Sequence, residues 1–137
     1  MPFMLKIQWD IKAGREADFR TNQAALCKVM LEHPGVICYH ADYPSERVSQ
    51  WTEIYATDEA FAAHLANEKG NGPLAAVIDA CDKITCQCWG NPNAGSKETL
   101  AGFAPQFAGV EIIGPTYHET ATNAFVLNPR ADRDSPI

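Results

Sequence analysis

The chain has 137 residues, 46% of them hydrophobic and 20% charged, which is enough length and apolar content for one folded domain. Its formal net charge of −6 disfavours binding to nucleic acid, because negative charge repels the phosphate backbone. No apolar stretch approaches the about 20 residues that span a bilayer, and the first residues do not resemble a signal peptide. We therefore expect a cytoplasmic protein with no nucleic-acid or membrane partner.

The first predicted element is a strand over residues 3–11, where apolar and polar residues alternate. A helix is predicted from about residue 15 to residue 32, because apolar residues recur there at helical spacing. The sequence His-Pro-Gly at 33–35 ends this helix, since proline disfavours helical geometry in the residue before it.

Two strands and a second helical region follow. Residues 36–43 and 48–55 are β-branched and aromatic enough for strands joined by a hairpin turn. A helix is predicted over 58–67, with Thr57 or Asp58 as its N-cap, and a second helical piece over 74–81 follows the Gly-rich interruption. A fourth strand is predicted over 83–90.

The five cysteines do not suggest a disulfide framework, because their number is odd and no small secreted scaffold surrounds them. Cys86 and Cys88 lie two residues apart in a predicted strand, so both face the same way. Zinc sites usually place Cys-x2-Cys on a turn, and we therefore expect buried thiols that pack as small hydrophobic groups, and no metal site.

The predicted order β-α-β-β-α-β is typical of the α+β ferredoxin-like fold, an antiparallel sheet with helices on one face. A second copy related by a two-fold axis would cover the other face, so we expect a homodimer. Residues 1–92 form this domain. Residues 93–137 form a C-terminal extension, packed on the same domain or on the partner subunit, with a short helix at 97–107 and strands at 109–114 and 119–128.

A motif shared with known enzymes begins in the third strand. The segment "QWTEIYATDEAFAAHLAN", preceded by "HPGVICYHADYP", resembles the antibiotic biosynthesis monooxygenase family, including its quinol monooxygenases, over about residues 3 to 90. The most specific part is W-x-E-x-Y followed by A-F-x-x-H, which is met by Trp51, Glu53, Tyr55, Ala60, Phe61 and His64. The resemblance implies a dimeric α+β barrel and cofactor-independent oxygenation of a small aromatic or quinol-type molecule.

His64 is the candidate catalytic base, because it shares the inward stripe of its predicted helix with Phe61 and Leu65. If Glu53 lies on the helix-facing side of its strand, its carboxylate would meet His64, orient the imidazole and raise the pKa of the ring. A histidine so placed could remove the O–H proton of a phenol. The alternative is a hydrogen-bonded core histidine with no catalytic part.

Aromatic side chains and one amide are candidates for binding the substrate, since small-molecule pockets are mostly apolar with a few polar groups. The substrate-binding candidates are Trp51, Tyr55, Phe61, Trp9 and Asn67. Two other functions stay open: a non-catalytic dimeric barrel that binds a small hydrophobic ligand, and an assembly module with no pocket.

Overall fold

The computed structural model describes residues 2–67, 72–102 and 107–118. Within these residues the strands and helices follow one another in the predicted order, and a fourth helix and a fifth strand come after them. The elements are β1 (Phe3–Ile11), α1 (Glu16–Met30), β2 (Val36–Ser45), β3 (Val48–Tyr55), α2 (Asp58–Asn67), α3 (Pro73–Asp79), β4 (Cys81–Gly90), α4 (Ala94–Ala101) and β5 (Glu111–His118).

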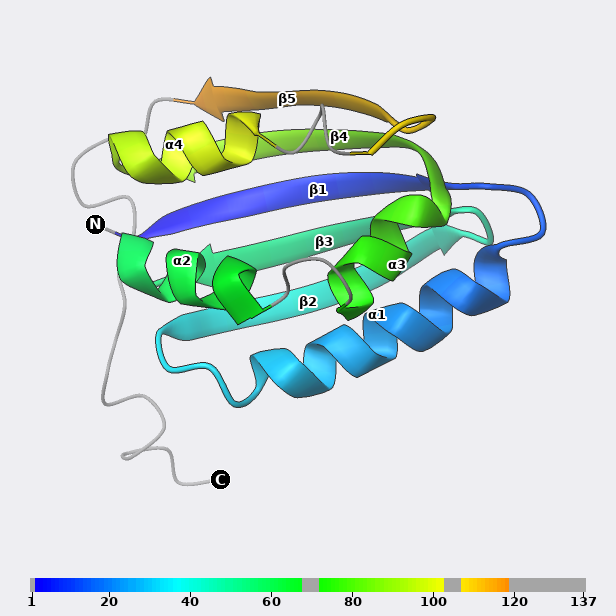
Figure 1. Cartoon of the computed structure of the whole chain (residues 1–137), viewed down its shortest axis with the longest axis horizontal. Coiled ribbons are helices and arrows are strands. Elements are labelled where there is room, and N and C mark those ends of the chain that lie inside the picture. Colours follow the sequence, from blue (N-terminus) through cyan, green and yellow to red (C-terminus); the bar gives the residue numbers. More distant parts are fainter. Residues whose placement is uncertain (1, 68–71, 103–106, 119–137) are drawn as a thin grey trace.

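One mixed sheet of order β2-β3-β1-β4-β5 carries the helices on one face (Figure 1). β1 is antiparallel to both β3 and β4, and β2 is antiparallel to β3, which confirms the ferredoxin-like arrangement. The four predicted strands are therefore antiparallel as expected, and β5, which belongs to the C-terminal extension, adds a parallel neighbour to β4 at the edge of the sheet. The cause is the crossover through α4, which returns the chain to the end of the sheet where β4 begins.

The fourth helix begins earlier than predicted because of its cap. Helix α4 starts at Ala94 and not at residue 97, since the Asn93 side chain accepts a hydrogen bond from the Ser96 N–H at 2.9 Å. The Asp58 carboxylate accepts from the Asn93 N–H at 2.8 Å and from the Ser96 hydroxyl at 2.6 Å. This part of the C-terminal extension therefore packs on the start of α2. The strand expected at 119–128 lies outside the described residues.

The face of the sheet under the helices is the core. The buried side chains of the central strands alternate as predicted and pack against α1 and α2, with rings of Phe3, Trp9, Phe19, Trp51, Tyr55 and Phe61 in mutual contact. Thr57 caps α2, its hydroxyl accepting from the Ala60 N–H at 3.1 Å. The core is thus aromatic at both ends of β3, with Trp9, Phe19 and Trp51 near its start and Phe3, Tyr55 and Phe61 where it leads into α2.

The opposite face of the sheet has no helix over it in the described part of the chain. It contains a groove of about 450 Å³ lined largely by polar side chains, among them Lys6, Gln8, Gln50, Thr52 and Gln87. At the edge of this face, Trp89 stacks on His118 with ring centroids 4.4 Å apart. The face therefore carries both polar and aromatic side chains. An entirely apolar face would by itself require a partner to cover it, and this face is not entirely apolar.

The turn between α1 and β2 requires glycine because it approaches α2 closely. Gly35 has a φ of +85°, a conformation that side-chain-bearing residues rarely adopt, and a Cβ there would lie 2.7 Å from the Ala60 Cβ. The Gly35 carbonyl accepts a hydrogen bond from the Ala56 N–H at 2.8 Å. The turn is thereby fixed against the helix that carries His64.

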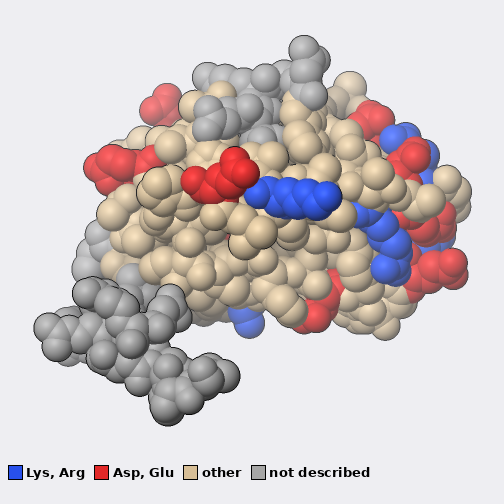
Figure 2. Space-filling view, turned by 90° about the horizontal axis from the view of Figure 1, so that it is seen from below, with Lys and Arg blue, Asp and Glu red and all other residues tan. Residues whose placement is uncertain are grey.

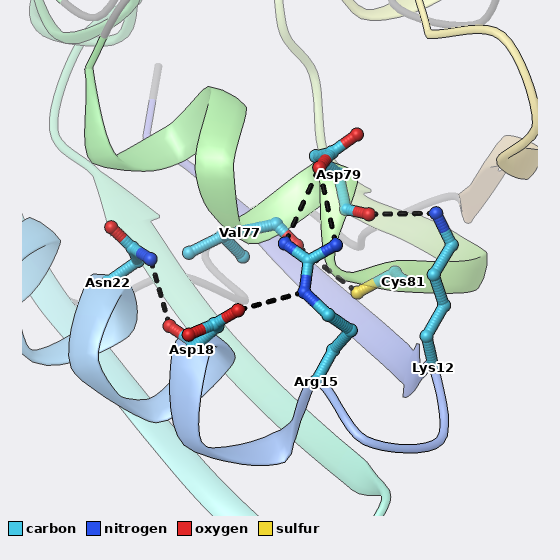
Figure 3. A network of polar contacts seen from close by, with 7 residues as sticks. All are labelled: Lys12, Arg15, Asp18, Asn22, Val77, Asp79 and Cys81. Carbon is cyan, nitrogen blue, oxygen red and sulfur yellow. Dashed lines mark hydrogen bonds and ion pairs between the residues drawn. The ribbon is translucent and has the colours of Figure 1, made fainter.

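Helix α3 is tied to the start of α1 by polar contacts (Figure 3). The Arg15 guanidinium pairs with the carboxylates of Asp18 at 2.9 Å and Asp79 at 3.4 Å, and the Lys12 ammonium donates to the Asp79 carbonyl at 2.9 Å. These groups are exposed, so each pair is individually weak. Figure 2 shows acidic and basic side chains interspersed over the visible face, without a continuous basic patch.

Candidate functional site

A small cavity lies between the sheet and helices α2, α3 and α4. Its volume is about 70 Å³, and most of its wall is aliphatic, including Leu5, Leu74, Ile78, Ile84 and Leu100. Two titratable side chains of the predicted site, Glu53 and His64, contribute to the same wall. An apolar cavity with a few polar groups is the usual form of a small-molecule site.

Glu53 is buried at 4% exposure in the central part of β3. Its carboxylate accepts a hydrogen bond of 2.7 Å from the Tyr55 hydroxyl, two residues further along the same face of the strand. Tyr39 is directly opposite Glu53 in the β2–β3 register, and its hydrogen bonding favours the ionised carboxylate. Burial outweighs both tyrosines and raises the pKa of Glu53 to about 7.

His64 lies on the inner side of α2 at 2% exposure. Its ring packs edge-on against Tyr39 and His33, with centroids 5.9 and 6.0 Å away, and stacks on Tyr55 at 6.2 Å. Burial, and secondarily the neighbouring His33, lower the pKa of His64 to about 4. The imidazole is therefore neutral near pH 7.

The predicted effect of Glu53 on His64 is wrong. The expectation was that a carboxylate contact would raise the pKa of the imidazole, whereas the pKa is lowered and the hydrogen bonds of Glu53 go to tyrosines. The physical reason is that burial disfavours charge on both groups. His64 does lie on the inner side of α2, as the helix pattern predicted, and Glu53 lies on the helix-covered face of the sheet, which the sequence left open.

The predicted aromatic residues divide between the cavity wall and the core beside it. Trp9 and Phe61 line the cavity. Trp51 and Tyr55 are fully buried in the core, where Trp51 packs on Trp9 at 4.5 Å. The side chain of Asn67 lies outside the described part of the structure.

Two residues near the carboxylate, Tyr39 and Cys86, are not among the catalytic and substrate-binding candidates given above. The position of Tyr39 opposite Glu53 depends on the register between β2 and β3. That register cannot be predicted from the hairpin sequence, because it depends on where the bulges lie. Cys86 lines the cavity and lies opposite Ile7 in the β1–β4 register. The alternation of residues 83–90 would have been enough to predict that it faces inward. Burial raises the pKa of Cys86 to about 12, so its thiol stays protonated and is a weak nucleophile.

Within the described ranges, no helix has the length and apolar character needed to cross a membrane. The same residues contain no group of three or more His, Cys, Asp or Glu side chains placed to hold a metal ion. Cys81, Cys86 and Cys88 are buried free thiols.

Comparison with known proteins adds evidence on the fold. No protein-family model and no curated protein matches the sequence. Among solved structures, MupZ from Pseudomonas fluorescens aligns with a TM-score of 0.57 and 13% identity over 92% of this chain and 93% of its own. SnoaB from Streptomyces nogalater, a cofactor-independent oxygenase, aligns with a TM-score of 0.55 and 13% identity over 68% of this chain and 95% of its own.

A third structure is a proposed antibiotic biosynthesis monooxygenase from Nitrosomonas europaea, with a TM-score of 0.55 and 15% identity over 65% of this chain and 97% of its own. At these identities the likeness concerns the fold. The chain therefore has the fold of the antibiotic biosynthesis monooxygenase-like proteins.

Proposed function

We propose that the protein is a cofactor-independent monooxygenase-type enzyme that acts on a small aromatic, quinol-type molecule. The observation that supports this most is Glu53, a carboxyl group in an apolar cavity whose pKa is raised to about 7. A general base works best when its pKa is near the working pH. The shared fold with a cofactor-independent oxygenase agrees with this proposal.

The proposed reaction needs no bound cofactor because the substrate supplies the electrons. One quinol and one O₂ give one hydroxyquinone and one water, so the quinol is oxidised and dioxygen is reduced. Removal of the O–H proton makes the aromatic ring electron-rich enough to react with O₂. Activation of the substrate is therefore the step for which a base is required.

We assign the base to Glu53 and a hydrogen-bonding part to His64. Above pH 7 the Glu53 carboxylate takes the hydroxyl proton, while Tyr55 holds the carboxylate in place through its 2.7 Å hydrogen bond. His64, with a pKa of about 4, is a weak base. It serves as a neutral hydrogen-bonding group beside the aromatic ring of the substrate. The mostly apolar wall lowers the local dielectric constant and thereby strengthens both polar contacts.

Oxygen uptake by the purified protein, without added flavin, haem or metal, tests the proposal against a panel of hydroquinones and naphthoquinols. We expect uptake above autoxidation, and a fall of about 100-fold or more in Glu53→Gln. Glu59→Gln, an exposed position on α2, is the matched control and should keep the rate of the parent protein.

Uptake that is no faster than autoxidation for every compound would reject the enzyme and favour a barrel that only binds a small hydrophobic ligand. A Glu53→Gln protein with full turnover would reject the assigned base.

We also propose a homodimer formed through the face of the sheet that lacks helices. The support is the groove of about 450 Å³ on that face, which no helix covers in the described residues. Sedimentation equilibrium is the test. A dimer that Trp89→Glu converts to monomer supports this interface, and a monomer at all concentrations rejects it.

A further inference from the structure

The size of the cavity limits what it can hold. Its volume of about 70 Å³ is less than half of the about 150 Å³ at which an engineered apolar cavity binds benzene. Because the cavity is partly open, a single ring can enter if the aliphatic walls yield slightly and one edge of the ring stays at the opening, whereas a fused second ring would need a much larger displacement of α3 or α4. Packed interiors resist such changes.

The charge of the cavity limits the ligand in a second way. In the described residues, no Lys or Arg side chain lines the cavity. His64 is neutral at pH 7, and Glu53 is neutral or negative. An anion such as a carboxylate or phosphate would find no counter-charge there, so a neutral ligand is favoured.

Of the polar groups at the cavity wall, Glu53 and His64 can each donate or accept a hydrogen bond, whereas the Trp9 indole N–H, which also lacks a partner among the described residues, can only donate. Glu53 presents a carboxyl group at the cavity wall. His64 Nδ1 is buried and has no hydrogen-bond partner among the described residues. A buried polar atom without a hydrogen bond lowers the stability of the protein. A ligand hydroxyl can supply the missing bond in either tautomer, because it donates to Nδ1 when that nitrogen has no hydrogen and accepts from it when it has one.

From the small volume, the neutral wall and these two groups, we infer that the cavity takes a neutral single-ring dihydroxyarene, with one hydroxyl bound by Glu53 and the other by His64 Nδ1. This inference rests on the proposed function, since it names the substrate class of the same cavity. If the inference is right, fused-ring diols, aromatic acids and rings with a single hydroxyl group are not tight ligands of the cavity.

Calorimetric titration without oxygen tests binding apart from turnover. The probes are catechol, resorcinol, hydroquinone, phenol, benzoate and naphthalene-1,4-diol. We expect at least one benzenediol to bind about tenfold more tightly than phenol, the effect of one added hydrogen bond. Benzoate and the naphthalenediol should bind more weakly than that benzenediol.

Variants assign the contacts. His64→Leu should remove the advantage of the benzenediol over phenol and leave phenol binding nearly unchanged, whereas His64→Gln, which keeps a hydrogen-bonding group, should retain part of it. Leu100→Ala enlarges the cavity and should admit the naphthalenediol. Leu26→Ala is the control, because Leu26 is also buried, in α1, but does not line the cavity.

The inference is overturned if the naphthalenediol binds the parent protein as tightly as any benzenediol, if His64→Leu leaves the diol-to-phenol ratio unchanged, or if no probe binds. Failure of the proposed function looks different: a benzenediol binds with the expected selectivity but is not oxidised. Conversely, oxygen uptake with naphthoquinols alone supports the enzyme and rejects the single-ring substrate.

Discussion

Replacing Glu53 by glutamine should change how the stability of the protein depends on pH. In the folded protein Glu53 keeps its proton up to a pKa of about 7, whereas in the unfolded chain it loses the proton near its ordinary 4.5. The stabilisation is present below pH 4.5 and is lost as pH rises through 7. At about 1.4 kcal/mol for each pH unit, the loss amounts to about 3 kcal/mol.

His64 has the opposite effect. Unfolded, it takes up a proton near 6.5, but in the folded protein only near 4, so its stabilisation is present above pH 6.5 and is lost as pH falls through 4. Between pH 4.5 and 6.5 the two residues therefore nearly cancel. The parent protein should show little pH dependence from this site.

Urea denaturation at pH 4, 5.5, 7 and 8 measures the effect. Glu53→Gln should match the parent at pH 4 and exceed its free energy of unfolding by about 3 kcal/mol at pH 8, which is a large part of a typical stability. His64→Gln should show the opposite trend, gaining most at pH 4. Parallel pH curves for Glu53→Gln and the parent would refute the reasoning, and Glu59→Gln serves as the exposed control.

Two further substitutions and one labelling experiment test the structure around the site. Gly35→Ala should lower the free energy of unfolding by about 2 to 3 kcal/mol, because it adds a Cβ at 2.7 Å from the Ala60 Cβ at positive φ; an unchanged urea midpoint would contradict the close turn. Thr57→Ala should cost about 1 kcal/mol through loss of the α2 cap, measured in the same way. The Cys86 thiol should react with a thiol reagent only on unfolding, whereas the partly exposed Cys38 should react in the native protein, as mass spectrometry of labelled peptides would show.

The fold could be predicted from the sequence where the pattern is local. Alternation in residues 3–11 and 48–55 identifies the faces of β1 and β3, and the His-Pro-Gly turn identifies the end of α1. The direction of β5 could not be predicted in this way. It depends on where the crossover through α4 returns the chain, and the contacts that position this helix, such as those of Asp58 with the α4 cap, are not visible in a local pattern.

The site could be predicted only in part for a similar reason. The helix pattern predicts that His64 faces inward, and alternation puts Trp51, Glu53 and Tyr55 on one face of β3, but the hydrogen-bond partner of a strand residue depends on register. Bulges in the β2–β3 pairing bring Tyr39 opposite Glu53 and leave Ile37 at 46% exposure, where simple alternation predicts an inward side chain. The pKa values then follow from burial depth, which the sequence pattern does not quantify.

The central claim is that Glu53 holds its proton to near neutral pH inside the cavity. The most direct measurement is a ¹³C NMR titration of the glutamate side-chain carboxyl groups, with the Glu53 signal assigned by its absence in Glu53→Gln. The account predicts a midpoint of about 7 for this one signal. A midpoint near 4.5, the ordinary value for glutamate, would contradict it.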